Sequence, residues 1–428
     1  MRQTLFFIPD KVGSLEVFGF GWLLIVWMLI SAFMVFRVVR RPNGRSEVTG
    51  LLPMFVIVAL AILFLIPRIE QEIPPGFATF PSVEAERGLP IRGYGVMLLL
   101  AVLAAVGIAV RRSQQAGLNP DIVFGLGFTV IISGIVGARL FFITQYWELI
   151  RGDTLFQTLG NMVSVVNGGL VVYGSLIGAA IGFLFYCYRH RLHPLALGDL
   201  IAPSLALGLA IGRIGCLLNG CCFGGPCQID YPWAVTFPAD SLPYVHQKSA
   251  GLLHGLELGQ DPNGHVLISR WDPPQAGDQV EPAVGESILK INGIEIQDLP
   301  HARAVLERVG PELMVTFSDG RQVSWSIEEL PPRSLPVHPT QIYSAINATL
   351  LFLVTMAYFP FRQRHGQVIA LLLSLYAITR FLLELIRTDE LAFAAQMTIS
   401  QNVSVWIGIG MVILWVYIMR QPKMLDAS

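Results

Sequence analysis

The chain has 428 residues, of which 53% are hydrophobic and only 14% are charged. Soluble domains carry about 25% charged residues, so this composition is typical of a polytopic membrane protein. The formal net charge of −1 gives no basis for nucleic-acid binding, and five cysteines are too few for a disulfide scaffold.

Apolar segments close to 20 residues long are the main signal for membrane helices. Nine are predicted, at 15–36, 51–66, 94–110, 122–143, 170–188, 197–218, 342–359, 368–386 and 403–418. The first segment runs into Arg37, Arg40 and Arg41 without a small-residue cleavage site, which argues against a signal peptide.

The charges of the loops set the predicted orientation. The loops after the first, third, fifth and seventh segments are rich in arginine, and the tail after the ninth carries Arg420 and Lys423. The alternate loops are poorer in basic residues and contain Glu70, Glu72, Glu84, Glu86, Glu148, Asp153, Asp389 and Glu390. The positive-inside rule therefore places the N-terminus outside the cell and the C-terminus in the cytoplasm.

Composition divides the chain into six parts. The predicted parts are a two-helix membrane hairpin at 1–67, an outer linker at 68–90, a membrane core at 91–224 and 337–420, an insert at 225–336, and a cytoplasmic tail at 421–428. The insert is polar and too long for a structureless loop, so we expect a globular module on the outer side.

The insert has the pattern of a small α+β domain. Strands are expected at 266–268, within 285–296, and in a hairpin of 313–317 and 322–327 turned by Asp319-Gly320, with a helix at 299–309. The segment from 285 through the helix resembles a PDZ domain, a module that binds peptide C-termini by strand addition. The weak candidate for its carboxylate-binding loop is 255–258. A structural lid without a ligand is equally compatible with the pattern.

Polar residues recur inside the apolar segments, in the half that the orientation rule places outside. They are Tyr94, Arg139, Tyr173, Arg213, Asn219, Arg380 and Glu384. A guanidinium inside a membrane helix costs about 3 kcal/mol on insertion scales, so it needs a partner. Arginines on separate segments favour an anion, and a phosphate at this depth would belong to a phospholipid headgroup. Snorkelling to the interface and structural pairing would also accommodate these charges.

Three further features are compatible with both a functional and a structural role. Tyr376, Arg380, Glu384 and Arg387 share one helical face, where Arg380 and Glu384 also fit a structural ion pair. The glycine-rich run 168–178 favours either tight helix packing or close approach of a ligand. His338 precedes a helix start and fits either substrate binding or a capping role.

Six motifs occur in an order that resembles the prolipoprotein diacylglyceryl transferase family. They are IRGYG at 91–95, GAR at 137–139, GGLVVYGSLIG at 168–178, GRIGCLLNGCCFG at 212–224, HPTQIY at 338–343, and Tyr376-x3-Arg380-Phe381-x2-Glu384-x2-Arg387. The resemblance covers 91–224 and 337–420. The N-terminal hairpin and the PDZ-like insert lie outside it.

The resemblance implies an all-α polytopic enzyme of the bacterial cytoplasmic membrane. A seven-helix core would carry two extra N-terminal membrane helices and the PDZ-like periplasmic domain. The implied reaction transfers the sn-1,2-diacylglyceryl group of phosphatidylglycerol to the lipobox cysteine of a preprolipoprotein. The products would be a thioether and glycerol phosphate, and no cofactor or metal is implied.

The family's motifs also assign roles to residues. Arg213 and Arg380 match essential arginines, while Tyr173 stands where the family has a histidine and becomes the third catalytic candidate. Tyrosine, with a pKa near 10, is a poor base at neutral pH. The substrate-binding candidates are Tyr94, Arg139, Asn219, Gly224, His338, Tyr376, Glu384 and Arg387.

Four cysteines gather near the GRIGCLLNGCCFG motif, at 216, 221, 222 and 227. On an oxidising outer side they favour one disulfide or packed thiols, and the spacing lacks the paired CxxC of a zinc site. A membrane thiol oxidoreductase would use these cysteines but would not need the arginines. A lipid or anion transporter would explain a polar pocket, and a receptor built on the PDZ-like module would explain the insert.

Overall fold

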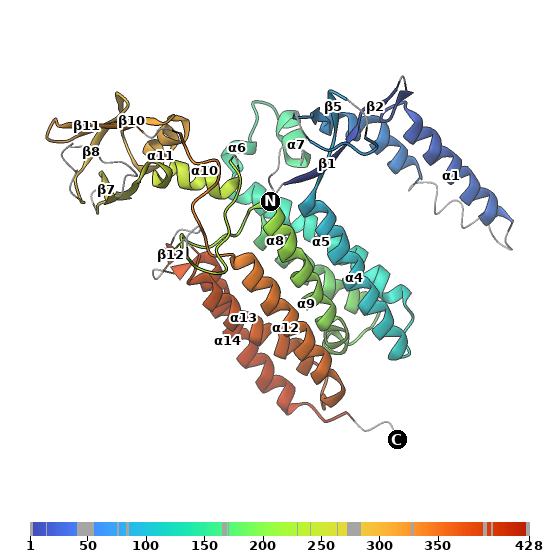
Figure 1. The fold of residues 1–428 in the computed structure, drawn as a ribbon. Helices are drawn as coiled ribbons and strands as arrows, with labels where there is room; N and C mark the ends of the chain where they lie inside the picture. The colour runs from blue at the N-terminus through green and yellow to red at the C-terminus, as the bar shows by residue number, and fades with distance from the viewer. Residues whose placement is uncertain are drawn as a thin grey trace. The chain divides into compact units, whose positions relative to one another are not determined.

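The computed structural model shows a mostly helical, polytopic protein (Figure 1). It describes residues 3–13, 15–40, 55–74, 77–82, 85–164, 169, 171–228, 230–239, 241–262, 264–271, 284–326, 329–387, 392–394 and 397–424. Within these ranges, eight helices are long and apolar enough to cross a membrane. They are α1 (Trp22–Val39), α4 (Gly93–Gln115), α5 (Asp121–Gln145), α8 (Val172–Arg189), α9 (Pro194–Asn219), α12 with its 3-10 end (Thr340–Phe361), α13 (Gln367–Glu384) and α14 (Ile399–Arg420).

The N-terminal hairpin differs from the prediction of two full spans. Helix α1 begins at Trp22 instead of Leu15, because β2 (Lys11–Val12) pairs with β3 (Leu15–Glu16) before the helix starts. The second segment is an apolar helix of Phe55–Ile69 whose middle is the π-helical stretch η1 (Ala61–Leu65). Its predicted start at 51–54 lies outside the described residues, as do Glu84, Asn167, Gly168, Leu170, Asp389 and Glu390.

The predicted outer linker at 68–90 contains two β-strands. Strand β5 (Arg87–Arg92) lies between β1 (Thr4–Pro9) and β4 (Gln71–Glu72) in an antiparallel sheet. The apolar residues of β1 drive this pairing, since Phe7 is buried and its ring meets that of Phe77 at 5.6 Å. Strand β5 leads directly into α4.

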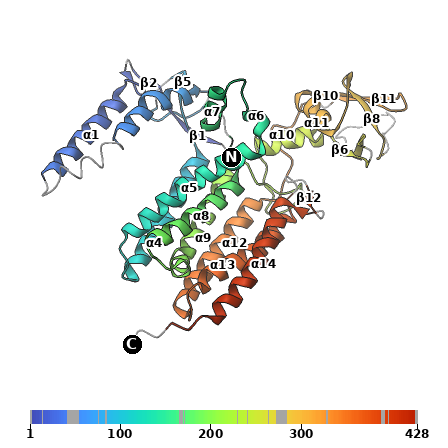
Figure 2. The same ribbon diagram turned by 180° about the vertical axis from the view of Figure 1, so that it is seen from behind.

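Two compact units share the chain. The first, called the bundle unit here, comprises 97–217, 222–236 and 335–428; the other comprises 1–96, 218–221 and 237–334. In the bundle unit, α5, α8, α9, α12, α13 and α14 lie side by side in both views (Figures 1 and 2). Two short helices, α6 (Trp147–Ile150) and α7 (Leu155–Val163), follow α5.

Glycines bring α5 and α8 together. A Cβ at Gly137 would collide with the backbone of Gly174 and Gly178, and a Cβ at Gly178 would collide with the carbonyl oxygen of Ser133. Small residues allow this close approach of membrane helices. The packing interpretation of the glycine-rich run is therefore confirmed for Gly174 and Gly178.

A remote carboxylate caps the start of α13. Helix α13 follows Gly366, which has a φ of +97° and no side chain to cap the helix. Instead, Asp199 of α9 accepts hydrogen bonds from the backbone N–H groups of Gly366, Val368 and Ile369, at 2.7, 2.8 and 3.0 Å. Asp199 is fully buried, so these N–H groups must stabilise its negative charge. Arg362, whose Nε lies 4.0 Å from the carboxylate, also contributes.

The strands and the helix predicted for the insert are confirmed. Strands β8 (Ile288–Ile291), β9 (Ile294–Glu295), β10 (Glu312–Phe317) and β11 (Gln322–Ser326) form a sheet of order β11-β10-β8-β9, and β7 (Val266–Trp271) and α11 (Leu299–Arg308) lie where expected. The sequence did not predict α10 (Leu242–Ser249), η2 (Leu252–His254) or β6 (Leu256–Gln260), which pairs with β7. Leu256 and Leu258, from the candidate carboxylate-binding loop, point into the core of the insert.

His254 is buried against this core with its ring fully excluded from solvent. Its Nε2 lies 3.0 Å from the carbonyl oxygen of Gly310, and its own carbonyl accepts a hydrogen bond from Trp325 Nε1 at 2.9 Å. Burial lowers the pKa of His254 below its usual value of about 6.5, because the interior disfavours the charged imidazole.

Replacing Asp199 by alanine should lower the free energy of unfolding by about 3 kcal/mol, since three buried N–H groups lose a charged acceptor. Thermal unfolding of the purified chain in detergent measures the change. The control is Asp121→Asn at the exposed start of α5, which should change stability by at most about 0.5 kcal/mol. Equal unfolding temperatures for the Asp199→Ala variant and the parent chain would contradict the capping role.

The insert should lose stability on acidification. Below about pH 6.5 the unfolded chain binds a proton at His254 that the folded insert resists, so stability falls by up to about 1.4 kcal/mol per pH unit. Hydrogen exchange of the β8 and β10 amides in the full chain, corrected for intrinsic rates, measures this loss. His254→Asn should flatten the dependence, whereas the same change at His265, whose side chain is 68% exposed, should leave it unaltered.

Candidate functional site

One end of α13 carries a buried ionic cluster. The carboxylate of Glu384, only 2% exposed, forms ion pairs with Arg380 one turn earlier and with Arg387 Nη1 at 3.3 Å. The i,i+4 and i,i+3 spacings place all three side chains on one helical face, as the sequence predicted. Glu384 thus holds two guanidinium groups in place where α13 ends.

Helix α14 adds a serine that links this cluster to α8. Arg380 Nη2 donates a hydrogen bond to Ser400 Oγ at 2.9 Å, and Tyr173 Oη lies 3.4 Å from the same oxygen. Ser400 is buried in the first turn of α14, after Thr398, which caps the helix in a capping box with Gln401. The structure therefore brings Tyr173, Arg380 and Glu384 into one network.

Arg213 belongs to α9 and is partly buried. Its guanidinium interacts electrostatically with Tyr376 on α13 and with the thiols of Cys216 and Cys222. The positive charge of Arg387 is also close enough to repel it. Arg213 therefore lies in the same region of the bundle unit as the ionic cluster at the end of α13. Three arginines therefore gather near Glu384 among the residues that the structure describes.

The end of the GRIGCLLNGCCFG motif lies against the segments just before α12 and just after α13. Gly224 N–H donates to the carbonyl oxygen of His338 at 2.9 Å, and Gly225 N–H donates to that of Ile386 at 3.0 Å. A Cβ at Gly224 would collide with His338 and Thr340, so only glycine permits this approach. The contacts place Gly224 and His338 beside the end of α13.

His338 is part of an aromatic group. Its ring packs edge to face on Tyr231 at 4.9 Å, and Tyr343 Oη lies 3.5 Å from its Nδ1. Tyr343 also donates a hydrogen bond to Tyr231 Oη at 3.2 Å. The two tyrosines fix the orientation of the His338 ring. This orientation is compatible with substrate binding and with a capping role.

Arg139 is bound to the backbone. Its Nε, Nη1 and Nη2 donate to the carbonyl oxygens of Met162, Gly169 and Asn161 at 2.9, 3.0 and 2.6 Å. The guanidinium also lies over the ring of Phe142, 5.1 Å from its centroid. Arg139 therefore fastens the end of α7 and the approach to α8, which places Tyr173.

Tyr94 and Asn219 belong to the other compact unit. Tyr94 is the second residue of α4 and is 41% exposed, while Asn219 is the last residue of α9 and its carbonyl oxygen accepts a hydrogen bond from Gln3 Nε2 at 3.0 Å. Their assignment to substrate binding stays a prediction.

The five cysteines are thiols in the structure, which agrees with packed thiols and not with a disulfide. The Sγ atoms of Cys216 and Cys222 lie within 4.8 Å of each other. Burial raises the pKa of Cys227, so its thiolate is disfavoured.

Three residues lie among the candidate site residues although the sequence did not predict them: Ser400, Tyr231 and Tyr343. Ser400 follows Thr398 in a capping-box pattern, so the sequence signals a helix start there but not its contact with Arg380. Tyr343 lies within the HPTQIY motif, and this position was the available signal for the aromatic group.

Comparison with known proteins identifies the family of the chain. A family model described as prolipoprotein diacylglyceryl transferase matches residues 82–417. A phosphatidylglycerol–prolipoprotein diacylglyceryl transferase of Rhodopirellula baltica is 33% identical over 94% of this chain and 86% of its own length. A second enzyme of that name, from Clostridium perfringens, is 26% identical over 77% of this chain and 91% of its own length. The chain belongs to the prolipoprotein diacylglyceryl transferase family.

Proposed function

We propose that this chain transfers the diacylglyceryl group of phosphatidylglycerol to the lipobox cysteine of a preprolipoprotein. The observation that carries the proposal is the gathering of Arg213, Arg380 and Arg387, from α9 and the end of α13, around the buried Glu384. Guanidinium groups that meet from separate helices inside a membrane favour an anionic ligand. The phosphodiester of a phospholipid supplies that charge, and both relatives are named for phosphatidylglycerol.

The arginines bind and stabilise the phosphate in this proposal. Arg213 and Arg380 contact the phosphodiester from two helices, and guanidinium groups suit phosphate because they donate two parallel hydrogen bonds. Their effect increases as the leaving group gains charge, which is the electrostatic stabilisation that such clamps provide. Glu384 orients Arg380 and Arg387 instead of acting as the base, since both guanidinium groups occupy it.

The reaction is a nucleophilic substitution at carbon. The cysteine sulfur of the lipobox forms a bond to the glyceryl carbon of the diacylglyceryl group, and the bond from that carbon to the phosphate oxygen breaks. Glycerol phosphate leaves with the electron pair, and the thiol proton passes to solvent or a base. Because a free thiol has a pKa near 8.5, a positive environment favours the thiolate.

In this scheme Tyr173 helps to position Ser400 and, through it, Arg380. Its hydroxyl reaches Ser400, and Ser400 accepts a hydrogen bond from Arg380. A tyrosine is a poor base at neutral pH, so Tyr173 acts through this hydrogen-bonded chain. Tyr376, His338 and Gly224 complete the proposed substrate-binding set of the bundle unit. Tyr94 and Asn219 are proposed as substrate-binding residues from the sequence motifs alone.

The proposed setting is the bacterial inner membrane, with the N-terminus and the insert on the periplasmic side and the C-terminus in the cytoplasm. The arginine-rich loops support this orientation. The PDZ-like insert is proposed to bind a peptide or protein segment, because its edge strands allow strand addition.

Arg213→Lys and Arg380→Lys should each reduce transfer by at least about 100-fold, because lysine cannot reproduce a bidentate phosphate contact. The assay mixes purified protein with phosphatidylglycerol and a lipobox peptide and measures glycerol phosphate release that depends on the peptide cysteine. Arg111→Lys, exposed near the end of α4, is the control and should remain active. Undiminished transfer by both site variants, with membrane insertion intact, would refute the assignment.

Ser400→Ala should lower kcat by about tenfold, because Arg380 loses a neutral hydrogen-bond partner that fixes its orientation. Ser400→Thr should restore most of the rate. Ser404→Ala serves as the matched control, since Ser404 is also buried on α14 but donates to the carbonyl of Ser400 one turn earlier. If Ser400→Ala and Ser404→Ala behave alike, the link through Ser400 has no catalytic part.

A further inference from the structure

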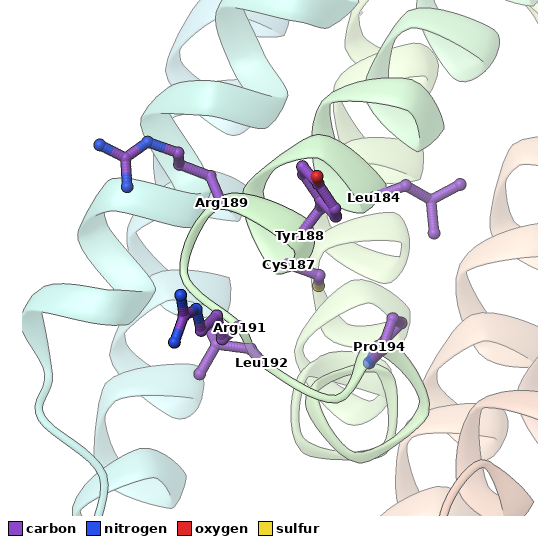
Figure 3. A pocket seen from close by; sticks show the side chains of 7 residues that line it. All are labelled: Leu184, Cys187, Tyr188, Arg189, Arg191, Leu192 and Pro194. Carbon is purple, nitrogen blue, oxygen red and sulfur yellow. The ribbon is translucent and has the colours of Figure 1, made fainter.

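A second basic site lies at the end of the bundle unit opposite Arg213. The turn from α8 into α9 lines an open hollow of about 610 Å³ (Figure 3). Arg189, Arg191 and the 85% exposed Tyr188 surround it, with the apolar side chains of Leu184 and Leu192 beside them. From the start of α9, Arg213 is 19 residues away, or about 28 Å along the helix.

The turn closes α8 in a Schellman motif. Leu192 N–H donates to the carbonyl oxygen of Cys187 at 2.9 Å, and Arg191 N–H donates to that of Tyr188 at 3.3 Å. This pattern requires a left-handed residue at the position after the cap, and Arg191 has a φ of +54°. Glycine is the usual residue there because it has no Cβ.

Local stability therefore does not explain the arginine at 191. A non-glycine residue in the left-handed region carries a conformational cost, and such positions concentrate where a side chain has a function. The side chain of Arg191 is exposed, so packing against other residues does not offset this conformational cost. What the arginine contributes must then come from its charge.

Both arginines of the hollow have their charge available. Neither side chain has a hydrogen-bond or ion-pair partner among the residues that the structure describes. In Figure 3 the two guanidinium groups extend to the same side of the turn, and the Tyr188 ring and Leu184 lie on its other side. Two arginines, an interfacial tyrosine and apolar side chains that line one hollow match a phospholipid headgroup with its first acyl carbons.

We propose that the α8–α9 turn binds the headgroup phosphate of an anionic phospholipid in the membrane leaflet opposite Arg213. Arg189 and Arg191 contact the phosphate, Tyr188 lies at the headgroup level, and Leu184 and Leu192 contact the acyl region. This site is separate from the arginines of α9 and α13 and would hold a lipid that is not consumed. It anchors the end of α8 whose other end carries Tyr173.

The test uses the full-length protein in neutral detergent, with phosphatidylserine as the probe because it differs from the proposed donor lipid. Phosphatidylserine should raise the unfolding temperature of the parent chain, whereas phosphatidylcholine and inorganic phosphate should not. Arg191→Gly should weaken the apparent affinity for phosphatidylserine about fivefold, and Arg189→Gln should do the same. Without lipid, Arg191→Gly should unfold at the same or a higher temperature, because glycine fits the left-handed position.

Arg111→Gln provides the matched control, as an exposed arginine near the end of α4 that does not line the hollow. Its affinity for phosphatidylserine should equal that of the parent chain. Equal affinity in Arg191→Gly, Arg189→Gln and the parent chain would overturn the proposal. So would a lower lipid-free unfolding temperature for Arg191→Gly, which would make the arginine structural, or equal stabilisation by inorganic phosphate, which would remove the lipid from the site.

Discussion

A carboxylate buried in a membrane helix is costly unless neighbouring groups balance its charge, and at Glu384 two arginines do so. The stabilisation is mutual. Glu384 needs Arg380 and Arg387, and the two guanidinium groups need Glu384 to keep their positions. Ser400 then fixes the far side of Arg380, so helices α13 and α14 share one polar contact. In the proposed function, Arg213 joins this cluster from α9 and the phosphate of the lipid binds beside it.

A second buried carboxylate sets the register between the two arginine-bearing helices. Asp199 of α9 caps α13 near Val368, so the two helices start in parallel from a common level. From that level, Arg213 is 14 residues along α9 and Arg380 is 12 residues along α13 from Val368. At 1.5 Å per residue these separations are about 21 and 18 Å, which brings both arginines to nearly the same depth. The cap at one end of the bundle thus positions the chemistry at the other.

These contacts also show which features a sequence can predict. The polar face of α13 follows from helical spacing, and the strands and helix of the insert follow from local alternation and the Asp319-Gly320 turn. Asp199 and Ser400 were missed because their roles depend on residues 167 and 20 positions away in the chain, respectively. The apolar strand β1 was missed because its partner β5 lies far along the sequence, within a segment that resembles a linker by composition.

The arginines of the bundle unit differ in what their donors contact, and this difference separates their functions. Arg139 uses three of its five N–H donors on backbone carbonyls and fastens the approach to α8, and its substrate-binding role stays a prediction. Arg380 contacts a carboxylate and a hydroxyl that orient its guanidinium group. Since α8 carries Tyr173 near one end and Arg189 at the other, the fastening by Arg139 and a lipid at the α8–α9 turn would act on the same helix, and through it on the hydroxyl that reaches Ser400.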